Sequence, residues 1–326
     1  MQVKESQMKV LSGIQPSGEL HLGNYFGAIR QYVRMQDEHD CFFFVANYHA
    51  LTSLREGPRL KKLSMDVAAD YLALGISPKK AAIFLQSDLP EVTELTWLLS
   101  TVTPMGLLQR CHAYKEKLAQ GLPADHGLFA YPVLMAADIL IQQADLVPVG
   151  QDQKQHVEVS RDIAERFNGI YGKVFRLPQP YILKDVAVVP GTDGRKMSKS
   201  YGNTIGMFEP EKSLKGKIMG IKTDSTPVEA PKDPDRCNLF ALFKLVASEE
   251  EKAEVERRYR AGGVGYGEVK KRLLALMLEY FAEARERRKE LAADMGKVRK
   301  VLDEGVDKAR AGARTTLRAA REAVGL

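Results

Sequence analysis

Cysteine and long apolar stretches are both scarce in this sequence. Its 326 residues include only three cysteines, and these are too scattered for a disulfide framework or a metal knuckle: Cys41, Cys111 and Cys237. No apolar run approaches the roughly 18 residues that a membrane-spanning helix requires, and residues 1–7 contain no apolar core of a signal peptide. We therefore expect a cytoplasmic protein with reduced cysteines, no protein-bound metal and no membrane association.

The charge is unevenly distributed along the chain. Residues 207–326 hold 26 Lys and Arg against 21 Asp and Glu, a net charge of +5, whereas residues 1–206 hold 22 against 21, a net charge of +1. Solvated helix faces account for most charges of this kind. The positive excess in the C-terminal part nevertheless suits a surface that faces a polyanion such as nucleic acid.

Apolar segments alternate with helical patterns through the first 206 residues. Strands that are covered on both faces are apolar without alternation, and four segments have this character, at 10–14, 41–46, 81–85 and 146–150. Apolar periodicity predicts helices at about 24–36, 58–75, 91–101, 104–117, 127–142 and 152–167. This order predicts an α/β fold with a doubly wound parallel, Rossmann-like sheet, which binds ligands at the carboxyl ends of its strands.

The strand pattern stops at residue 206. Helical periodicity instead predicts helices at about 209–218, 237–246, 249–260, 266–290 and 292–324. We therefore expect two domains, a Rossmann-like catalytic domain over residues 1–206 and an all-helical C-terminal domain over residues 207–326.

A glycine-containing loop follows the first predicted strand. Residues 16–24 read Pro-Ser-Gly-Glu-Leu-His-Leu-Gly-Asn, so that Gly18 and Gly23 bracket His21 just before a predicted helix. Glycines let backbone N–H groups approach a nucleotide, and the N-terminal end of a helix favours phosphate. His21 and Asn24 can donate further hydrogen bonds to phosphate oxygens. For such a loop taken alone, a tight turn between strand and helix is the commoner explanation.

Lysine and serine are concentrated in residues 196–200, which read Lys-Met-Ser-Lys-Ser, and turn-forming residues flank them on both sides. Transfer of a nucleotidyl group needs positive charge on the leaving pyrophosphate, in a site that can close and reopen. Lys196 and Lys199 supply that charge, with Ser198 and Ser200 as extra donors, and the reaction requires no protein nucleophile. The alternative is a surface loop that is phosphorylated.

Together these two segments resemble the paired signatures of the class I aminoacyl-tRNA synthetases. The first signature usually ends in His, whereas this chain has Asn24, as the tryptophan-specific branch commonly does. The resemblance therefore narrows to the tryptophanyl-tRNA synthetases of the bacterial type, and it extends over essentially the whole chain. It implies three substrates, ATP with Mg²⁺, L-tryptophan and tRNA(Trp). The implied reaction forms tryptophanyl-adenylate and then transfers tryptophan to the 3′ end of the tRNA.

Substrate choice is best read from residues 131–140. Tyr131, Met135 and Asp138 are spaced at i, i+4 and i+7 and so share one face of a helix. Tyr131 and Met135 can pack on an indole ring, while the Asp138 carboxylate can accept the indole N–H. Spacing alone fits equally well a core methionine and a surface aspartate. The same segment resembles the tryptophan-recognition helix of the family at all three positions, which favours the pocket.

The resemblance also assigns individual residues to the substrates. It implies four catalytic residues: His21, Lys196, Ser198 and Lys199. It implies that ATP contacts Gln15, Pro16, Ser17, Gly23, Asn24, Gly150, Gln151, Asp152, Val188, Val189, Lys196, Met197, Ser198, Lys199 and Ser200. It implies that tryptophan contacts Gln15, His49, Tyr131, Met135, Asp138 and Gln153. A structural turn explains His49 equally well, and Leu11 stands where relatives often have an aromatic residue beside the indole.

Further expectations concern the assembly. The resemblance implies a homodimer formed through the apolar helical region around residues 91–140, anticodon recognition by residues 207–326, and a last helix that packs back on the first domain. It implies no iron–sulfur cluster, because Cys237 is the only cysteine after residue 206. Three other functions stay open: a tyrosine-specific synthetase of the same fold, a small-molecule nucleotidyltransferase without a tRNA partner, and a non-catalytic sensor.

Overall fold

The computed structural model describes residues 7–111, 125–150, 153–182 and 189–326. Its centre is a five-stranded parallel sheet in the order β3-β2-β1-β4-β5, formed by Ala81–Leu85, Asp40–Val45, Lys9–Ile14, Leu146–Val149 and Gln179–Ile182. The strand order changes direction between β1 and β4, and open parallel sheets hold their ligands at such a switch point. The predicted α/β fold with a Rossmann-like parallel sheet is confirmed.

The strand β5 was not predicted from the sequence. Its residues alternate between exposed and half-buried positions at the edge of the sheet, and Pro180 interrupts its apolar pattern. A half-exposed edge strand lacks the continuous apolar run that marks the buried strands β2 and β3.

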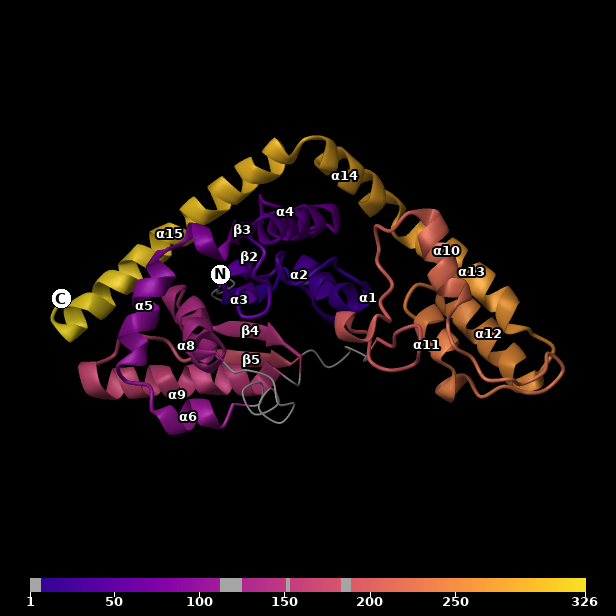
Figure 1. Cartoon of the computed structure of the whole chain (residues 1–326), viewed down its shortest axis with the longest axis horizontal. Helices are drawn as coiled ribbons and strands as arrows, with labels where there is room; N and C mark the ends of the chain where they lie inside the picture. The colour runs from indigo at the N-terminus through magenta and orange to yellow at the C-terminus, as the bar shows by residue number, and fades with distance from the viewer. Residues whose placement is uncertain (1–6, 112–124, 151–152, 183–188) are drawn as a thin grey trace, which may run out of the picture.

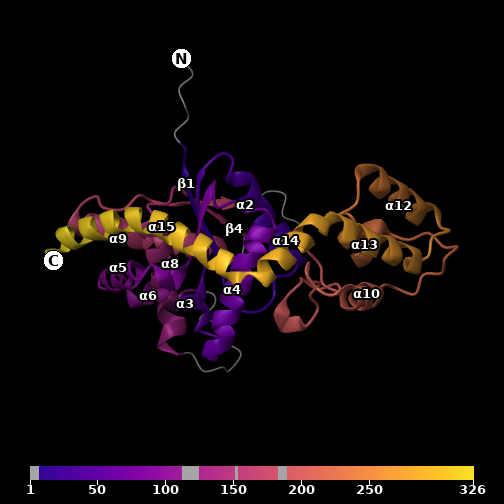
Figure 2. The same cartoon turned by 90° about the horizontal axis from the view of Figure 1, so that it is seen from above.

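Two hydrophobic cores lie on the two faces of the sheet, because successive strand residues point to opposite sides. Phe43 of β2 belongs to one core, whereas its neighbours Phe42 and Phe44 belong to the other. The first core is completed by α2 (Arg30–Met35) and α4 (Gly57–Ala73). The second is completed by α5 (Glu91–Ser100), α8 (His126–Ile141) and α9 (Lys154–Tyr171). Figures 1 and 2 show these helices around the sheet.

The helix predicted over residues 24–36 is in fact three consecutive pieces. α1 (Leu22–Asn24) leads into a π-helical turn, η1 (Tyr25–Ile29), which continues as α2. The aromatic rings at the start of this turn, Tyr25 and Phe26, both pack against Tyr280 and Phe281 of the C-terminal helices. A π-turn of this kind depends on tertiary contacts, which hydrophobic periodicity does not report.

The helix predicted over residues 104–117 appears in its described part as α6 (Met105–Gln109), and residues 112–117 lie outside the described ranges. Among the helices that the structure describes, none combines the length and the apolar character needed to span a bilayer.

Helices dominate the chain after residue 206. α10 (Glu211–Met219), α11 (Asn238–Phe243), α12 (Glu249–Ala261) and α13 (Tyr266–Tyr280) gather in a lobe to one side of the sheet (Figure 1). The segment predicted as one helix over 266–290 is broken at Phe281, whose buried ring packs on Tyr25. α14 (Ala282–Ala293) and α15 (Met295–Val324) then run back along the part that contains the sheet (Figures 1 and 2).

Helix α15 packs directly against the edge strand β3. Gly305 makes this approach possible, since a Cβ atom at that position would lie 1.9 Å from the carbonyl oxygen of Ile83. Helix α15 near the end of the chain and the strands near its start therefore share one packed body, and the lobe of α10–α13 lies to one side of the sheet (Figure 1).

Candidate active site

The glycine loop (residues 16–24) and the lysine loop (residues 196–200) meet in the folded protein. The Lys199 ammonium donates a hydrogen bond of 2.8 Å to the carbonyl oxygen of Gly18, and it lies 3.4 Å from the Ser17 hydroxyl. Gly18 has a φ of +148°, and a Cβ atom there would lie 3.2 Å from Cδ of Lys199. Gly18 therefore serves both the backbone conformation of the loop and its close approach to the lysine.

His21 is buried at the start of α1, where its pKa is strongly lowered. Burial, followed by the positive charges of Lys199 and Lys217, lowers the pKa of His21 to about 4. The imidazole is therefore neutral near pH 7 and can act there as a hydrogen-bond donor rather than a cation. The Asn24 side chain accepts a 3.0 Å hydrogen bond from the backbone N–H of His21 and so fixes the turn into the helix.

The lysine loop is held at its base by backbone contacts. The Met197 N–H donates to the carbonyl oxygen of Val189 at 2.9 Å, and the Met197 side chain is buried. Lys199 begins a short 3₁₀ turn, η4 (Lys199–Tyr201). Burial lowers the pKa of the Lys199 ammonium to about 8, and the carboxylates of Glu19 and Asp70 oppose part of this shift.

Asn203 organises the lysine loop, and sequence reasoning did not identify it as a functional residue. Its buried side chain accepts from the Ser198 N–H at 2.8 Å and donates to Asp193 at 2.7 Å and to the carbonyl oxygen of Lys196 at 3.2 Å. The hydrogen bond from Asn203, followed by those from Arg195, lowers the pKa of Asp193 to about 2. An asparagine just after Gly202 is typical of a turn, so only its burial in the folded protein distinguishes Asn203 from an ordinary turn residue.

The predicted specificity face lies on α8 and contains a buried carboxylate. The Asp138 side chain lies 2.9 Å from Nε2 of His49, which belongs to α3 (Asn47–Ala50). The Gln86 amide, in the 3₁₀ turn η2 (Gln86–Asp88) that follows β3, donates to both Asp138 oxygens at 2.9 and 2.8 Å. Burial raises the pKa of Asp138, and the hydrogen bonds from His49 and Gln86 oppose that shift.

The other two residues of this face have different surroundings. The Tyr131 hydroxyl is hydrogen-bonded to Nε2 of His156 on α9, and the Tyr131 ring lies edge-on to His49 with centroids 6.1 Å apart. Met135 is half-buried against the second core. Leu11 is fully buried in that same core, on the face of the sheet that α8 covers.

A cavity of about 400 Å³ opens beside His49 and Tyr131. Leu51, Thr93 and Leu134 are among the other residues that line it. Gln15 connects this region to the glycine loop, because its side-chain amide donates to the carbonyl oxygen of His49 at 3.2 Å and lies 3.4 Å from the Ser53 hydroxyl. The cavity is thus next to the predicted nucleotide loop and is large enough for an amino-acid side chain.

The protein family described as tRNA synthetases class I (W and Y) matches residues 3–282. The chain belongs to this family. The tryptophan–tRNA ligase of Fusobacterium nucleatum is 55% identical over 317 residues, which cover 97% of each chain, and that of Rhodopirellula baltica is 54% identical over 98% of this chain and 100% of the relative.

A solved structure agrees with these relatives. The crystal structure of tryptophanyl-tRNA synthetase from Campylobacter jejuni complexed with ADP and tryptophan has a TM-score of 0.92 and 52% identity, and the match covers 98% of this chain and 100% of that one. The predicted membership of the tryptophanyl-tRNA synthetases is confirmed.

The remaining predicted site residues of this synthetase differ in how deeply they are buried. Pro16 and Val189 are buried, and the carbonyl oxygen of Val189 already accepts the Met197 N–H. Gly150 accepts a hydrogen bond from the N–H of Gln153, which immediately precedes α9 and has an exposed side chain. Several are half-buried or exposed at the rim of the two loops: Gln15, Ser17, Gly23, Asn24, Lys196, Ser198 and Ser200. Three lie outside the described residues: Gln151, Asp152 and Val188.

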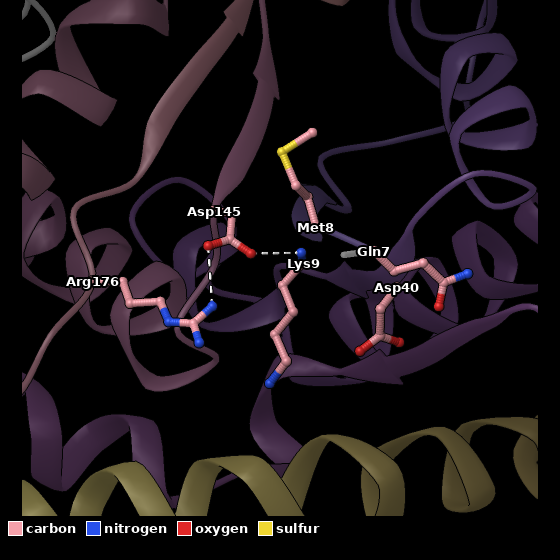
Figure 3. A pocket seen from close by; sticks show the side chains of 6 residues that line it. All are labelled: Gln7, Met8, Lys9, Asp40, Asp145 and Arg176. Atoms are coloured by element: carbon pink, nitrogen blue, oxygen red, sulfur yellow. Dashed lines mark hydrogen bonds and ion pairs between the residues drawn. The ribbon is translucent and has the colours of Figure 1, made fainter. Parts of the chain in front are cut away.

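A second cavity, of about 480 Å³, lies at the amino ends of the strands, the edge opposite the two loops of the synthetase. Its charged groups are largely paired: the Asp145 carboxylate accepts from the Lys9 N–H at 2.8 Å and lies 3.2 Å from the Arg176 guanidinium (Figure 3). Among the residues described here, no group of three or more His, Cys, Asp or Glu side chains is placed to hold a metal ion.

Proposed function

We propose that this chain is a tryptophan–tRNA ligase. It activates L-tryptophan with ATP to form tryptophanyl-adenylate and pyrophosphate, then transfers the tryptophanyl group to the 3′ end of tRNA(Trp). The observation that carries the proposal is the buried Asp138 carboxylate, which contacts His49 in the wall of a cavity. The hydrogen bond from Gln15 to His49 joins that cavity to the glycine loop, which Lys199 contacts in turn. High identity to tryptophan–tRNA ligases over nearly the full chain supports it independently.

The first step displaces pyrophosphate. A carboxylate oxygen of tryptophan attacks the α-phosphorus of ATP, and the bond from that phosphorus to the β-phosphate oxygen breaks. Lys196, Ser198 and Lys199 stabilise the charge that develops on pyrophosphate, and neutral His21 donates a hydrogen bond to a phosphate oxygen. Mg²⁺ enters as part of the ATP substrate. In the second step a terminal tRNA hydroxyl attacks the carbonyl carbon and AMP leaves.

The substrate contacts are proposed as the sequence predicted them. ATP binds to Gln15, Pro16, Ser17, Gly23, Asn24, Gly150, Gln151, Asp152, Val188, Val189 and residues 196–200. Tryptophan binds to Gln15, His49, Tyr131, Met135, Asp138 and Gln153, with the Asp138 carboxylate accepting the indole N–H. The short distance between Gln15 and His49 supports a shared boundary between the two subsites.

We also propose that residues 207–326 contact the tRNA anticodon and that two copies pair through the region around residues 91–140. The net charge of +5 after residue 206 supports the first assignment. Trp97 on α5 and Met105 on α6 support the second, because these large apolar side chains are 69% and 63% exposed. The enzyme is expected to act in the cytoplasm.

The experiment that tests the function is exchange of pyrophosphate into ATP, run with each amino acid in turn and followed by charging of tRNA. Exchange with tryptophan alone, followed by charging, is the expected result. Exchange with tyrosine instead would favour the tyrosine-specific alternative, exchange without charging a small-molecule nucleotidyltransferase, and no exchange a sensor. Charging should fall more steeply with salt than exchange does, because tRNA binding releases counterions. Sedimentation of a species of 36.3 kDa at micromolar concentration would contradict the dimer.

A further inference from the structure

Gln86 makes a contact that none of the assigned site residues makes, because its amide faces both oxygens of Asp138. The Gln86 side chain is 1% exposed and that of Asp138 is 4% exposed, so neither hydrogen bond is shared with bulk water. We propose that Gln86 is a specificity-positioning residue, which orients the Asp138 carboxylate and keeps it a pure acceptor for the N–H of the substrate ring. This inference rests on the proposed function.

The orientation of the Gln86 amide is fixed from its far end. Its carbonyl oxygen accepts a 2.9 Å hydrogen bond from the backbone N–H of Tyr48, at the start of α3. A backbone N–H can only donate, so the amide oxygen must face Tyr48 and the NH₂ group must face Asp138. The side chain cannot flip without losing three hydrogen bonds at once.

This arrangement favours one protonation state of Asp138. A protonated carboxyl would need an acceptor for its O–H, and the Gln86 NH₂ group offers none. Among the contacts of the described residues, Nε2 of His49 could accept that proton only in the tautomer protonated at Nδ1. His49, from α3, is the titratable group in direct contact with Asp138, and Tyr131, on α8, lies edge-on to His49. A donor at Gln86 therefore holds an acceptor at Asp138, even though burial acts in the opposite direction.

The two oxygens of Asp138 are not equally satisfied. Within the part of the chain that the structure describes, Oδ2 accepts from Gln86 and contacts His49, whereas Oδ1 accepts from Gln86 only. A carboxylate oxygen can accept two hydrogen bonds. Oδ1 is thus the oxygen with an acceptor position left for a ring N–H, and a ligand without that donor leaves it desolvated and unpaired.

The sharpest test changes only the donor. In the Gln86→Glu variant one oxygen of the new carboxyl group can still accept the Tyr48 N–H. The other oxygen can donate to Asp138 only when the new carboxyl group is protonated. Two carboxyl groups at this distance cannot both ionise without a large penalty. Tryptophan affinity of the variant should therefore weaken by about tenfold at high pH and return toward the wild-type value at low pH.

A matched control exists in Gln36, on the other face of the sheet. Gln36 is 6% exposed, donates to the carbonyl oxygens of Val33 and Gly75, and accepts from the Ser77 N–H at 2.8 Å. The Gln36→Glu variant thus introduces a buried carboxyl into a similar set of hydrogen bonds, far from Asp138. It should lower the midpoint of thermal unfolding and leave tryptophan affinity unaltered.

The experiment is calorimetric titration of the full chain with tryptophan, and with the analogue whose indole N–H is replaced by sulfur, between about pH 6 and pH 9. Dividing each variant affinity by the wild-type affinity at the same pH removes the pH dependence that the two proteins share. The expected result is a pH-dependent loss for tryptophan and a much smaller loss for the sulfur analogue in Gln86→Glu only. In Gln86→Leu, which removes the donor and adds no charge, tryptophan affinity should be weakened over this whole pH range.

Two results would overturn the inference. Wild-type affinity for tryptophan in both Gln86 variants, at every pH, would show that Gln86 is ordinary packing while leaving the proposed function intact. Equal losses for tryptophan and for the sulfur analogue would show that Gln86 shapes the cavity without acting on the ring N–H. A wild-type chain that binds no tryptophan would instead overturn the proposed function, and this inference with it.

Discussion

The ammonium group of Lys199 and the carbonyl oxygen of Gly18 lie 2.8 Å apart, although 181 residues separate them in sequence. This hydrogen bond joins the lysine loop to the glycine loop at the carboxyl ends of the strands. Burial of the ammonium, rather than this hydrogen bond, lowers the pKa of Lys199 to about 8. Most Lys199 side chains therefore still carry their charge at pH 7, and that charge is lost as the pH rises through about 8.

Replacing Lys199 with Ala should slow adenylate formation far more than it weakens tryptophan binding. The charge of Lys199 acts mainly while pyrophosphate gains negative charge, so its removal should lower kcat. The expected decrease in kcat is on the order of 10²–10³-fold. In the wild type, kcat/KM for ATP should decline as the pH rises through about 8, where Lys199 loses its proton. Lys199→Arg should move that decline to higher pH. Unchanged turnover with only a raised KM for ATP would show that Lys199 binds the ground state alone.

Gly18→Ala should slow pyrophosphate exchange through a steric effect on Lys199. The new methyl group would strain a backbone with a φ of +148° and would press on Cδ of Lys199 at 3.2 Å. Gly172 is the matched control, since it has a φ of +95° but no atom within 4 Å of its Cβ position. Both variants should lose about 1–3 kcal/mol of unfolding free energy, and only Gly18→Ala should lose kcat. Equal kcat in the two variants would refute the contact.

Asn203→Ala should loosen the lysine loop and lower kcat for exchange by about tenfold or more, with a small effect on tryptophan affinity. The control is Asn168→Ala. Asn168 also holds a turn through three hydrogen bonds, to Val174 and Phe175, but lies away from the site. Urea unfolding should show similar losses of stability in both variants. A kcat that falls equally in both would mean that Asn203 matters only for stability.

Arg288→Met should destabilise the protein in a pH-dependent manner. Arg288 on α14 donates to Asp70 and Asp66 of α4 at 2.6 and 2.9 Å. Burial raises the pKa of Asp70 to about 6, above its ordinary value of 3.8, and Arg288 opposes that rise. The folded protein thus holds a proton that the unfolded chain releases, so the contribution of Asp70 to stability is lost as the pH rises through about 6.

Without Arg288 the pKa of Asp70 rises further, and an unpaired buried carboxylate remains at neutral pH. The variant should lose about 3–5 kcal/mol near pH 7.5 and clearly less near pH 5, where Asp70 is protonated. Urea unfolding at the two pH values measures the difference. The same loss at both pH values would assign the effect to packing of the arginine stem instead.

The parts of the fold that local pattern determines were predictable. The apolar run from Cys41 to Val45 indicated a strand covered on both faces, and its side chains do divide between two cores. The π-turn at Tyr25 and the break at Phe281 were not predictable, because both accommodate an aromatic cluster between segments more than 200 residues apart. The half-exposed strand β5 lacks the continuous apolar run that predicts a buried strand.

In the candidate site, too, local pattern predicted some residues and missed those that depend on tertiary contacts. Helical spacing placed Tyr131, Met135 and Asp138 on one face, and that face is where α8 carries its buried carboxylate. Spacing could not reveal Gln86 or Asn203, because each acts through partners that the chain brings together only on folding. A polar residue directly after a buried strand, as Gln86 is after β3, was the available signal.

The Asp138 carboxylate should account for most of the preference for tryptophan over phenylalanine. A pocket that merely fits an apolar ring separates similar shapes by roughly 1–3 kcal/mol, whereas a buried acceptor that must be satisfied discriminates far more strongly. With Asp138 intact, tryptophan should be favoured over phenylalanine by on the order of 10⁴-fold or more in kcat/KM. Asp138→Ala should remove most of that margin, leaving the KM for ATP nearly unaltered.

Asp138→Asn should reduce the preference for tryptophan less than Asp138→Ala does, since an amide oxygen still accepts one hydrogen bond. The amide NH₂ group would nevertheless face either Gln86 or His49, both of which now direct hydrogen bonds at the carboxylate. Exchange assays with tryptophan and phenylalanine measure the margin in each variant. If Asp138→Ala keeps the full preference for tryptophan, the buried carboxylate is part of ordinary helix packing, and the specificity of the enzyme resides in the shape of the cavity beside Tyr131.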